Sequence, residues 1–498
     1  MRATTLHLHT AVRIAPVDPR IFGGFLEHMG RAVYEGVYDP TSAHADAAGF
    51  RTDVLAALRR LRFTVMRYPG GNFVSGYHWE DGIGPRDQRP LRVEKAWDSK
   101  EPNHVGTDEF MSLCRTMGWQ PMITVNLGTG SADEARHWVE YCNGRSGTQY
   151  GDRRAANGQR EPYGVALWCL GNEMDGPWQL GHCSAEEYAA RAQAAARLMR
   201  SVDASIETVA CGSSAPFMPT FADWDARVLE NIDDQADYIS LHRYVGNWSG
   251  DTRDYLAVTN SIDRQIEDID AVARAVQAKR KSGKRILLSF DEWNVWYKTL
   301  DITGNTAKGE FPAHLIEEVY NLEDALVVAG FLNSFVRHAD SVKVANLAQI
   351  VNVIAPVLTR GDALLIQSIF YPIEMFATRR RGVALRVAVE GPRYHSESYG
   401  DADEIDCSAI LDRNQVHVFM TNRHLDEAAT VTVAVADRRI VRTRAAEILS
   451  GPSAHAENSF EHPAVICSAP LAGVTLSSGR ADVPLSPLSF AAVTFELE

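Results

Sequence analysis

The sequence lacks any long apolar run. None of its uncharged apolar stretches approaches the length of about 18 residues that favours a transmembrane helix. The first residues, MRATTLHLHT, contain no apolar segment of the kind found in secretory signal peptides. Both absences favour a cytoplasmic protein that has no membrane partner.

Cysteine is also scarce. The seven cysteines are odd in number, scattered, and never spaced as C-x-x-C, which argues against a disulfide framework or a metal site built from cysteine pairs. The sequence has no P-loop, no H-E-x-x-H motif and no dinucleotide-binding glycine pattern. We therefore expect reduced thiols, no required cofactor and no bound metal.

Basic residues are too few to balance the acidic ones. The 50 Lys and Arg residues face 64 Asp and Glu residues, which gives a formal net charge of −14. Such a surplus of negative charge repels nucleic acids and anionic membranes. The hydrophobic content of 45% is ample for a large core. These properties favour a globular protein with a neutral or small substrate and no nucleic-acid partner.

What the sequence does contain is a regular alternation of short apolar runs and amphipathic stretches, typical of parallel βα units. Capping boxes that begin at Ser131 and Ser184 predict two of the helix starts. Eight βα units predict an α/β fold that closes into a (β/α)8 TIM barrel, over residues 18–378. The eight predicted strands are Ile21–Phe25, Thr64–Arg67, Pro121–Asn126, Ala166–Leu170, Thr208–Cys211, Tyr238–His242, Ile286–Phe290 and Val342–Asn346.

The last part of the chain has a different pattern. Over residues 379–498, short alternating segments are separated by Gly, Pro, Asn and Asp, which predicts an antiparallel β-sandwich of the jelly-roll kind. The strand-like segment Thr4–Ile14 cannot be stable alone, so we expect residues 1–17 to join this C-terminal sandwich. Two polar segments, Asn143–Gly164 and Lys298–Pro312, are predicted to be long loops that shape the mouth of the barrel.

Two glutamates stand where apolar strands open into loops. Glu173 follows the fourth predicted strand and Glu292 follows the seventh. Either one alone is equally well explained as an ion-pair partner or a helix cap. Both are expected at the same end of a parallel barrel, where a pair of carboxylates can cleave a glycosidic bond.

The residues around these glutamates form longer motifs. The motifs are FGGFLEH at 22–28, RYPGGNFVSGY at 67–77, WCLGNEMDGPWQ at 168–179 and DEW at 291–293. Together they resemble the α-L-arabinofuranosidases of glycoside hydrolase family 51, and the resemblance covers the whole chain. It implies a retaining mechanism in which Glu292 is the nucleophile and Glu173 is the acid/base.

The same resemblance implies roles for neighbouring polar residues. Asn172 would bind the sugar 2-hydroxyl, Arg67 would hold the nucleophile ionised, and Tyr244 would donate to Glu292. Simpler interpretations are that Asn172 shapes its loop, that Arg67 forms a barrel-end salt bridge and that Tyr244 is part of the wall.

The resemblance also implies which residues surround the sugar. Glu27, Asn72 and Gln349 match positions that contact the furanose hydroxyls, although polar residues at strand ends are common in any barrel. The candidates for apolar walls against the sugar or the leaving group are Trp97, Trp178, Trp296 and Phe25, although most such side chains serve packing.

The expected activity is that of an exo-acting enzyme that removes terminal non-reducing α-L-arabinofuranosides from arabinose-containing oligosaccharides of arabinoxylan or arabinan. An alternative on the same fold is an endo-β-1,4-glucanase or xylanase, which needs an open cleft. A third, less favoured alternative is a non-catalytic carbohydrate-binding relative. Resemblance to the family also implies a homo-oligomer, a hexamer.

Overall fold

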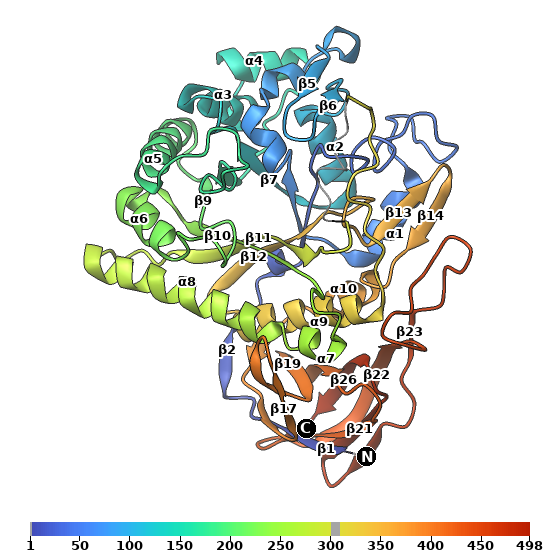
Figure 1. Cartoon of the computed structure of the whole chain (residues 1–498). Coiled ribbons are helices and arrows are strands. Elements are labelled where there is room, and N and C mark those ends of the chain that lie inside the picture. The colour runs from blue at the N-terminus through green and yellow to red at the C-terminus, as the bar shows by residue number, and fades with distance from the viewer. Residues whose placement is uncertain (1, 300–308) are drawn as a thin grey trace.

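The computed structural model describes residues 2–299 and 309–498 (Figure 1). Eight parallel strands close into a barrel in the order β10-β11-β12-β3-β4-β7-β8-β9. All eight predicted strands are present, and the predicted TIM barrel is confirmed. The strands are β3 Gly23–Phe25, β4 Val65–Tyr68, β7 Gln120–Val125, β8 Leu167–Leu170, β9 Glu207–Ala210, β10 Tyr238–Val245, β11 Leu287–Val295 and β12 Val342–Ala348.

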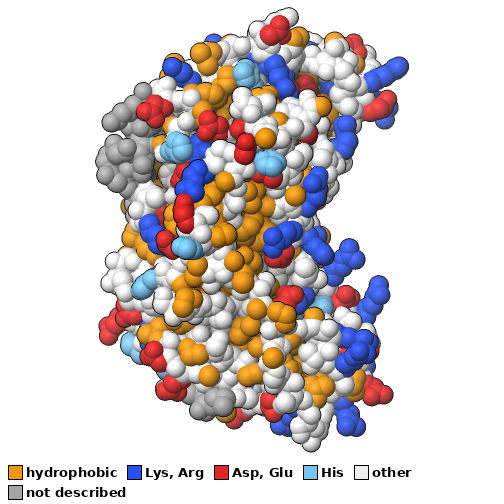
Figure 2. All heavy atoms as spheres, turned by 90° about the vertical axis from the view of Figure 1, so that its right-hand side faces the viewer, with side chains coloured by type: hydrophobic (Ala, Val, Ile, Leu, Met, Phe, Trp, Pro, Cys, Tyr) orange, Lys and Arg blue, Asp and Glu red, His pale blue; other side chains and the backbone are white. Residues whose placement is uncertain are grey.

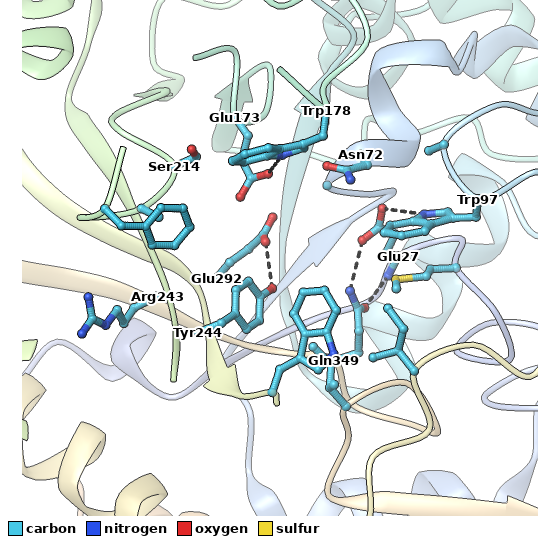
Figure 3. A pocket seen from close by; sticks show the side chains of 18 of the residues that line it. Glu27, Asn72, Trp97, Glu173, Trp178, Ser214, Arg243, Tyr244, Glu292 and Gln349 are labelled. Atoms are coloured by element: carbon cyan, nitrogen blue, oxygen red, sulfur yellow. Dashed lines mark hydrogen bonds between the residues drawn. The ribbon is translucent and has the colours of Figure 1, made fainter. Parts of the chain in front are cut away.

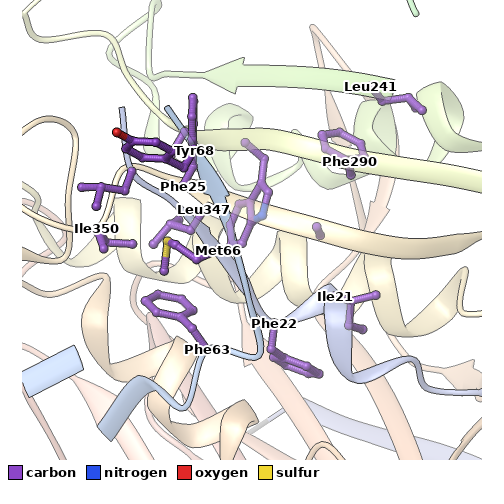
Figure 4. Packing of buried hydrophobic residues seen from close by; sticks show 14 of the residues in the cluster. Ile21, Phe22, Phe25, Phe63, Met66, Tyr68, Leu241, Phe290, Leu347 and Ile350 are labelled. Atoms are coloured by element: carbon purple, nitrogen blue, oxygen red, sulfur yellow. The ribbon is translucent and has the colours of Figure 1, made fainter. Parts of the chain in front are cut away.

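The barrel strands are apolar along their length because both of their faces are buried. Every residue of β4 and of β8 is buried. Side chains that point inward, such as those of Met122 and Val344, fill the lumen. Those that point outward pack against the helices, and Figure 4 shows Phe63, Met66 and Leu347 within this layer. The interior is therefore a packed core, and a ligand can bind only at an end of the barrel.

Helices surround the barrel, and two of them begin where the sequence predicts. The Ser131 hydroxyl accepts from the Glu134 amide, and the Ser184 hydroxyl accepts from the Glu187 amide. The helices are α1 Thr52–Leu61, α2 Thr107–Met117, α3 Ala132–Asn143, α4 Gln149–Ala156, α5 Ala185–Val202, α6 Asp223–Asn231, α7 Thr252–Leu256, α8 Thr259–Arg280, α9 Leu322–Arg337 and α10 Phe370–Ala377. Short 3-10 turns are η1 Pro19–Ile21, η2 Asn72–Gly76, η3 Trp79–Gly82, η4 Arg86–Gln88 and η5 Asp233–Gln235.

The segment Asn143–Gly164, predicted to be a loop, contains helix α4. Thr148 caps this helix by accepting from the Gly151 amide. Arg154 is fully buried and donates to the backbone carbonyls of Tyr141, Gln159 and Arg160. Because Arg154 is part of its buried face, α4 shows only a weak apolar periodicity in the sequence. The other predicted loop, Lys298–Pro312, includes residues 300–308, which lie outside the described residues.

The C-terminal part forms a β-sandwich, as predicted. One sheet has the order β2-β15-β19-β20-β26-β22-β23 and the other β16-β1-β21-β25-β24. The N-terminal strands belong to it: β1 pairs with β21 and β16, and β2 pairs with β15. The strands are β1 Arg2–Leu8, β2 Arg13–Pro16, β15 Val383–Leu385, β16 Ala388–Glu390, β19 Ile405–Asp412, β20 Gln415–Asn422, β21 Ala429–Val435, β22 Ile440–Ser450, β23 Cys467–Pro470, β24 Thr475–Ser477, β25 Arg480–Leu485 and β26 Ser489–Leu497.

In the described part of the chain, three two-stranded sheets lie outside the barrel and the sandwich. They are β5 Arg92–Glu94 with β6 Ser99–Glu101, β13 Val357–Arg360 with β14 Ala363–Ile366, and β17 Arg393–Ser396 with β18 Gly400–Asp403. Trp97 lies in the turn of the β5–β6 hairpin.

Helices α9 and α10 lie between the barrel and the sandwich (Figure 1). Helix α9 contacts β11 on one side and β19 on the other, and it is buried from Leu322 to Val336. Most residues of α9 are apolar, as expected for a helix covered on all sides. Its buried Glu323, Asp324 and Asn333 all have hydrogen-bond partners. Helix α10 ends at Ala377 and β15 begins at Val383. The exact boundaries of the two domains, at residues 18 and 378, stay a prediction.

The outer surface mixes charged and apolar side chains. On the face that carries the β13–β14 hairpin, hydrophobic side chains gather in a band along the middle, with charged side chains mostly at its margins (Figure 2). Extended apolar patches of this kind often mark interaction surfaces. Within residues 2–299 and 309–498, each helix is too short or too polar to cross a membrane.

The aromatic stack between α10 and the sandwich should be critical for stability. Phe376 is fully buried, with its ring centroid 3.8 Å from that of Phe419 and 5.5 Å from that of Phe490. We expect Phe376→Ala to lower the free energy of unfolding by about 3–5 kcal/mol, because it opens a cavity in this contact. Urea unfolding measures the loss. The same exchange at Phe311, which is 41% exposed, is the matched control and should cost much less.

Candidate active site

The two predicted glutamates lie together at the carboxyl end of the barrel. Glu173 follows β8 and Glu292 lies in the last half of β11. They border a cavity of about 550 Å3. Its other lining residues include Glu27, Met29, Gly71, Asn72, Trp97, Trp178, Ser214, Phe217, Arg243, Tyr244, Trp248, Trp296 and Gln349 (Figure 3).

Glu292 is held by two donors. Arg67 Nη1 donates to Oε1 at 2.6 Å, and the Tyr244 hydroxyl donates to Oε2 at 2.9 Å. Burial raises the pKa of Glu292, whereas the positive charges of His242 and Arg67 oppose that rise. Its position in a strand and its two fixed donors orient one carboxylate oxygen toward the cavity.

Arg67 connects several parts of the site. Its side chain is almost fully buried, and its Nη2 donates to Oδ1 of Asn172 at 2.7 Å. Its Nε lies 3.4 Å from Asp291, which directly precedes Glu292. One guanidinium thus fixes a carboxylate on β11 and an amide after β8 at the same time.

Phe25 differs from its predicted place. It is fully buried and is not among the residues that line the cavity. Its ring lies under the guanidinium of Arg67, 4.6 Å from centroid to Cζ. Phe25 therefore supports Arg67 from below by a cation–π contact and forms no wall against a ligand.

Glu173 has a different environment. His242 Nδ1 lies 2.8 Å from its Oε1, and Trp178 Nε1 donates to its Oε2 at 2.6 Å. Glu173 also has a left-handed backbone, with φ of 44°. Such a conformation costs about 1–3 kcal/mol outside glycine. The turn aims the carboxyl group across the cavity toward Glu292.

The two carboxyl groups are close. One oxygen of Glu173, one oxygen of Glu292 and a ring nitrogen of His242 all lie within 4.8 Å of one another. His242 is nearly fully buried, and its second nitrogen lies 3.6 Å from Asp291. Burial lowers the pKa of His242, but the acidic groups around it raise it to about 10. The ring is therefore an imidazolium at neutral pH.

The opposite end of the cavity is lined by a polar network. The Glu27 carboxylate accepts from the Phe73 amide at 3.0 Å, from Trp97 Nε1 at 3.4 Å and from Gln349 Nε2 at 3.2 Å. The Glu27 amide in turn donates to Oε1 of Gln349 at 2.8 Å. Burial, reinforced by the charge of Glu292, raises the pKa of Glu27 to about 8. Glu27 can therefore act as a donor as well as an acceptor near neutral pH.

Gly71 lies between Glu27 and Glu292. A Cβ atom at this position would lie 3.1 Å from Oε2 of Glu27 and 3.1 Å from Oε1 of Glu292. The absence of a side chain leaves space between the two carboxylates. Asn72, the next residue, starts η2 and lines the cavity.

All three predicted tryptophans line the cavity. Trp97 closes the end beside Glu27, and Glu94 holds its turn by accepting from the Trp97 amide at 2.6 Å. Trp296 packs edge-on against Tyr244 at 5.6 Å. Trp178, beside Glu173, is 47% exposed.

Glu173, His242 and Glu292 are also the one group of the described residues that could surround a metal ion. A metal ligand must be the neutral imidazole, whereas His242 has a pKa of about 10 and holds its proton firmly. The Nδ1 atom that would bind the ion already faces the Glu173 carboxylate at 2.8 Å. The contacts of His242 in this structure are therefore those of an ion-paired imidazolium.

Comparison with known proteins identifies the family. The "Alpha-L-arabinofuranosidase 1 domain" matches residues 57–259, and the "Alpha-L-arabinofuranosidase C-terminal domain" matches residues 291–489. An intracellular exo-α-(1→5)-L-arabinofuranosidase from Halalkalibacterium halodurans is 45% identical over 85% of each chain. This chain belongs to the family 51 α-L-arabinofuranosidases. The resemblance seen in its motifs is confirmed.

One further relative of this arabinofuranosidase family member has another linkage in its name, and two solved structures share its fold. An exo-α-(1→6)-L-arabinofuranosidase from Bifidobacterium longum is 39% identical, over 96% of this chain and 95% of its own. A solved family 51 α-L-arabinofuranosidase from Bifidobacterium longum has a TM-score of 0.95 at 36% identity, over the whole of both chains. An α-L-arabinofuranosidase from Thermotoga maritima in complex with arabinose has a TM-score of 0.88 at 33% identity, over 99% and 100% of the chains.

Sequence reasoning missed part of the site of this family member. His242 and Asp291 were not predicted, although one lies two residues before Tyr244 and the other directly before Glu292. The available signals were the closeness of His242 to Tyr244 and of Asp291 to Glu292 in the sequence. The lining residues Phe217 and Trp248, from the loops after β9 and β10, carry no motif and were also missed.

The charge on His242 can be tested directly. We expect its ring to remain an imidazolium at pH 8 and to titrate near about 10, because Glu292, Asp291 and Glu173 stabilise the cation. Since this pKa exceeds the ordinary value of about 6.5, the charge stabilises the fold most below that pH, and the gain is lost as the pH rises toward about 10. NMR of 15N-histidine-labelled protein measures the titration, and His242→Gln assigns the signal. A titration near pH 6.5 would contradict the assignment.

Proposed function

We propose that this chain is a retaining, exo-acting α-L-arabinofuranosidase, which removes terminal non-reducing α-L-arabinofuranosides from arabinoxylan or arabinan oligosaccharides. The observation that carries the proposal is the spacing of Glu173 and Glu292, whose oxygens approach within 4.8 Å. Retaining glycosidases have carboxyl groups about 5–5.5 Å apart, whereas inverting enzymes need room for a water molecule between them.

In the first step, a free oxygen lone pair of Glu292 attacks the anomeric carbon. The bond from this carbon to the leaving oxygen breaks, and the proton of Glu173 passes to that oxygen. The product is a covalent arabinofuranosyl ester of Glu292. Arg67 and Tyr244 keep the nucleophile in place, with contacts of 2.6 and 2.9 Å.

In the second step, water attacks the same carbon from the side that the leaving group has vacated. Glu173, now ionised, takes a proton from this water, and the ester bond to Glu292 breaks. Two inversions at one carbon give overall retention. The imidazolium of His242, 2.8 Å from Glu173, stabilises the carboxylate that forms between the two steps.

Exo action is favoured by the closed end of the cavity. Glu27 and Gln349 are buried at 4% and 2% exposure, and Trp97 lies over them. A terminal furanose can place its hydroxyls against Glu27, Asn72 and Gln349. The oligosaccharide cannot continue past these residues. A site that hydrogen-bonds each hydroxyl rejects analogues that lack one. The family resemblance supports Asn172, which Arg67 holds in place, as the residue that binds the sugar 2-hydroxyl.

Location and assembly are further parts of the proposal. The Halalkalibacterium halodurans relative is named an intracellular enzyme, and we propose the same cytoplasmic location for this chain. We also propose a homo-oligomer, a hexamer, as the family resemblance implies. The apolar band beside the β13–β14 hairpin is the kind of surface that a partner subunit would cover (Figure 2).

The function is tested by comparing two substrates. We expect hydrolysis of 4-nitrophenyl α-L-arabinofuranoside and of arabino-oligosaccharides, and none of carboxymethyl cellulose, because a closed pocket takes chain ends only. Glu173→Ala should lower kcat on arabino-oligosaccharides by about 10²–10⁴-fold, the typical contribution of a general acid. Glu186→Ala, an exposed glutamate on α5, is the matched control. Cleavage of carboxymethyl cellulose would favour the endo-glucanase alternative instead, and full turnover by Glu173→Ala would refute the mechanism.

The configuration of the product distinguishes the roles of Glu173 and Glu292. Glu292→Gly should be inactive in water, and added azide should restore turnover by taking the vacated space, giving a glycosyl azide of inverted configuration. With Glu173→Ala, azide should react with the glycosyl-enzyme and give the retained configuration. NMR of the two azide products measures this. The opposite pairing of variant and configuration would exchange the two roles.

A further inference from the structure

We propose that Phe217 and Trp248 form a binding site for the second sugar of the leaving group, so that the enzyme prefers linear, neutral oligosaccharides with at least two sugars beyond the scissile bond. This inference rests on the proposed function. It adds a preference for chain length that the contacts of the two carboxylates do not require.

The position of the leaving group follows from Glu173. The acid must face the oxygen that leaves, and Trp178 donates to Glu173 at 2.6 Å while 47% of its surface remains exposed. The first leaving sugar therefore lies against Trp178. Ser214 lies on the side of Glu173 away from Glu27 and Trp97 (Figure 3). The loop that starts there extends the cavity in the direction in which the leaving chain continues.

Phe217 stands out on this loop. It lines the same cavity, yet 78% of its surface is exposed. The loop fixes it in place: the Met218 amide donates to the Ala215 carbonyl at 3.1 Å, which closes a turn with Pro216 at its first corner. Asp175 anchors the start of the loop by accepting from the Ser214 amide at 3.0 Å. The ring is therefore presented to solvent on a defined support.

Trp248 is presented in a similar way from the loop after β10. It lines the cavity and is 61% exposed. Tyr297 supports it from the side, with ring centroids 6.0 Å apart in a T-shaped contact. Two large aromatic rings, exposed at one cavity mouth and held by separate loops, are costly in water unless a ligand covers them.

The chemistry of this part of the cavity fits a neutral sugar. Ala215 and Pro216 form the wall beside Phe217. Rigid aromatic side chains offer a large contact area at low entropic cost, and the apolar faces of sugar rings pack well on them. The cavity of about 550 Å3 lies in the range of about 300–1,000 Å3 that takes ligands much larger than one pentose.

Chain length is the measurement that tests this site. Wild-type kcat/KM should rise about tenfold from α-1,5-arabinobiose to arabinotriose, which corresponds to about 1.4 kcal/mol, and should change little with arabinotetraose. The double variant Phe217→Ala, Trp248→Ala should lose this rise. Its kcat/KM should fall less on arabinobiose and on 4-nitrophenyl arabinofuranoside than on arabinotriose, since neither substrate has a second leaving sugar.

The controls separate the possible outcomes. Leu198→Ala removes an exposed apolar side chain on α5, outside the cavity lining, and should leave the chain-length profile unchanged. Phe217→Leu and Phe217→Ala, each made alone, keep the test usable if the double variant loses activity on the aryl substrate. A wild-type enzyme without the rise, or a rise that persists in the double variant, would overturn the proposal. If the variants keep the chain-length profile but change the molar mass measured by light scattering, Phe217 and Trp248 contact a partner subunit instead of a sugar. A wild-type chain that cleaves no arabinofuranoside would refute the proposed function itself.

Discussion

The active site depends on the buried contact between Arg67 and Glu292. Both side chains are nearly excluded from water, and an unpaired charge at such a place would cost several kcal/mol. Arg67 comes from β4 and Glu292 from β11, so the pair forms only when the barrel closes with these strands in register. Asn172 and Phe25 then take their positions from Arg67, through a hydrogen bond and a ring contact. The proposed nucleophile, Glu292, is thus oriented by the fold itself and does not depend on a mobile loop.

A barrel that holds so many charges at one end needs a large apolar core elsewhere. The lumen below the site is filled by side chains such as Met122 and Val344, and α9 is buried along almost all its length between the barrel and the sandwich. The sandwich covers α9 and α10, and the stacked rings of Phe376 and Phe419 join the two domains. The C-terminal domain therefore contributes to function indirectly, by keeping the helices that support β11 in place.

The sequence predicts those features that leave a periodic or local mark. The barrel strands are continuous apolar runs, so Glu173 and Glu292 could be placed at strand ends from the sequence alone. Helix α4 could not, because its support is the buried Arg154 and its apolar periodicity is weak. Phe25 was misplaced because a three-residue strand gives too little alternation to decide which way a side chain points. His242 was missed because its importance lies in contacts with Glu173 and Asp291, which are far away in sequence.

The different roles proposed for Glu173 and Glu292 follow from the charges around them and from the lone pairs of Glu173. Arg67 and His242 are both cationic, and Asp291 and Glu292 beside them balance those charges when ionised. The proposed mechanism needs Glu173 to hold the proton that passes to the leaving oxygen. Its oxygens accept one hydrogen bond each, from Trp178 and His242, so each keeps a lone pair for that proton. In the proposed first step this proton passes to the leaving oxygen while the negative charge of Glu292 is lost in the ester, and His242 can then pair with Glu173. The net charge of the site is therefore constant through the first step, which is why one imidazolium can serve both carboxylates.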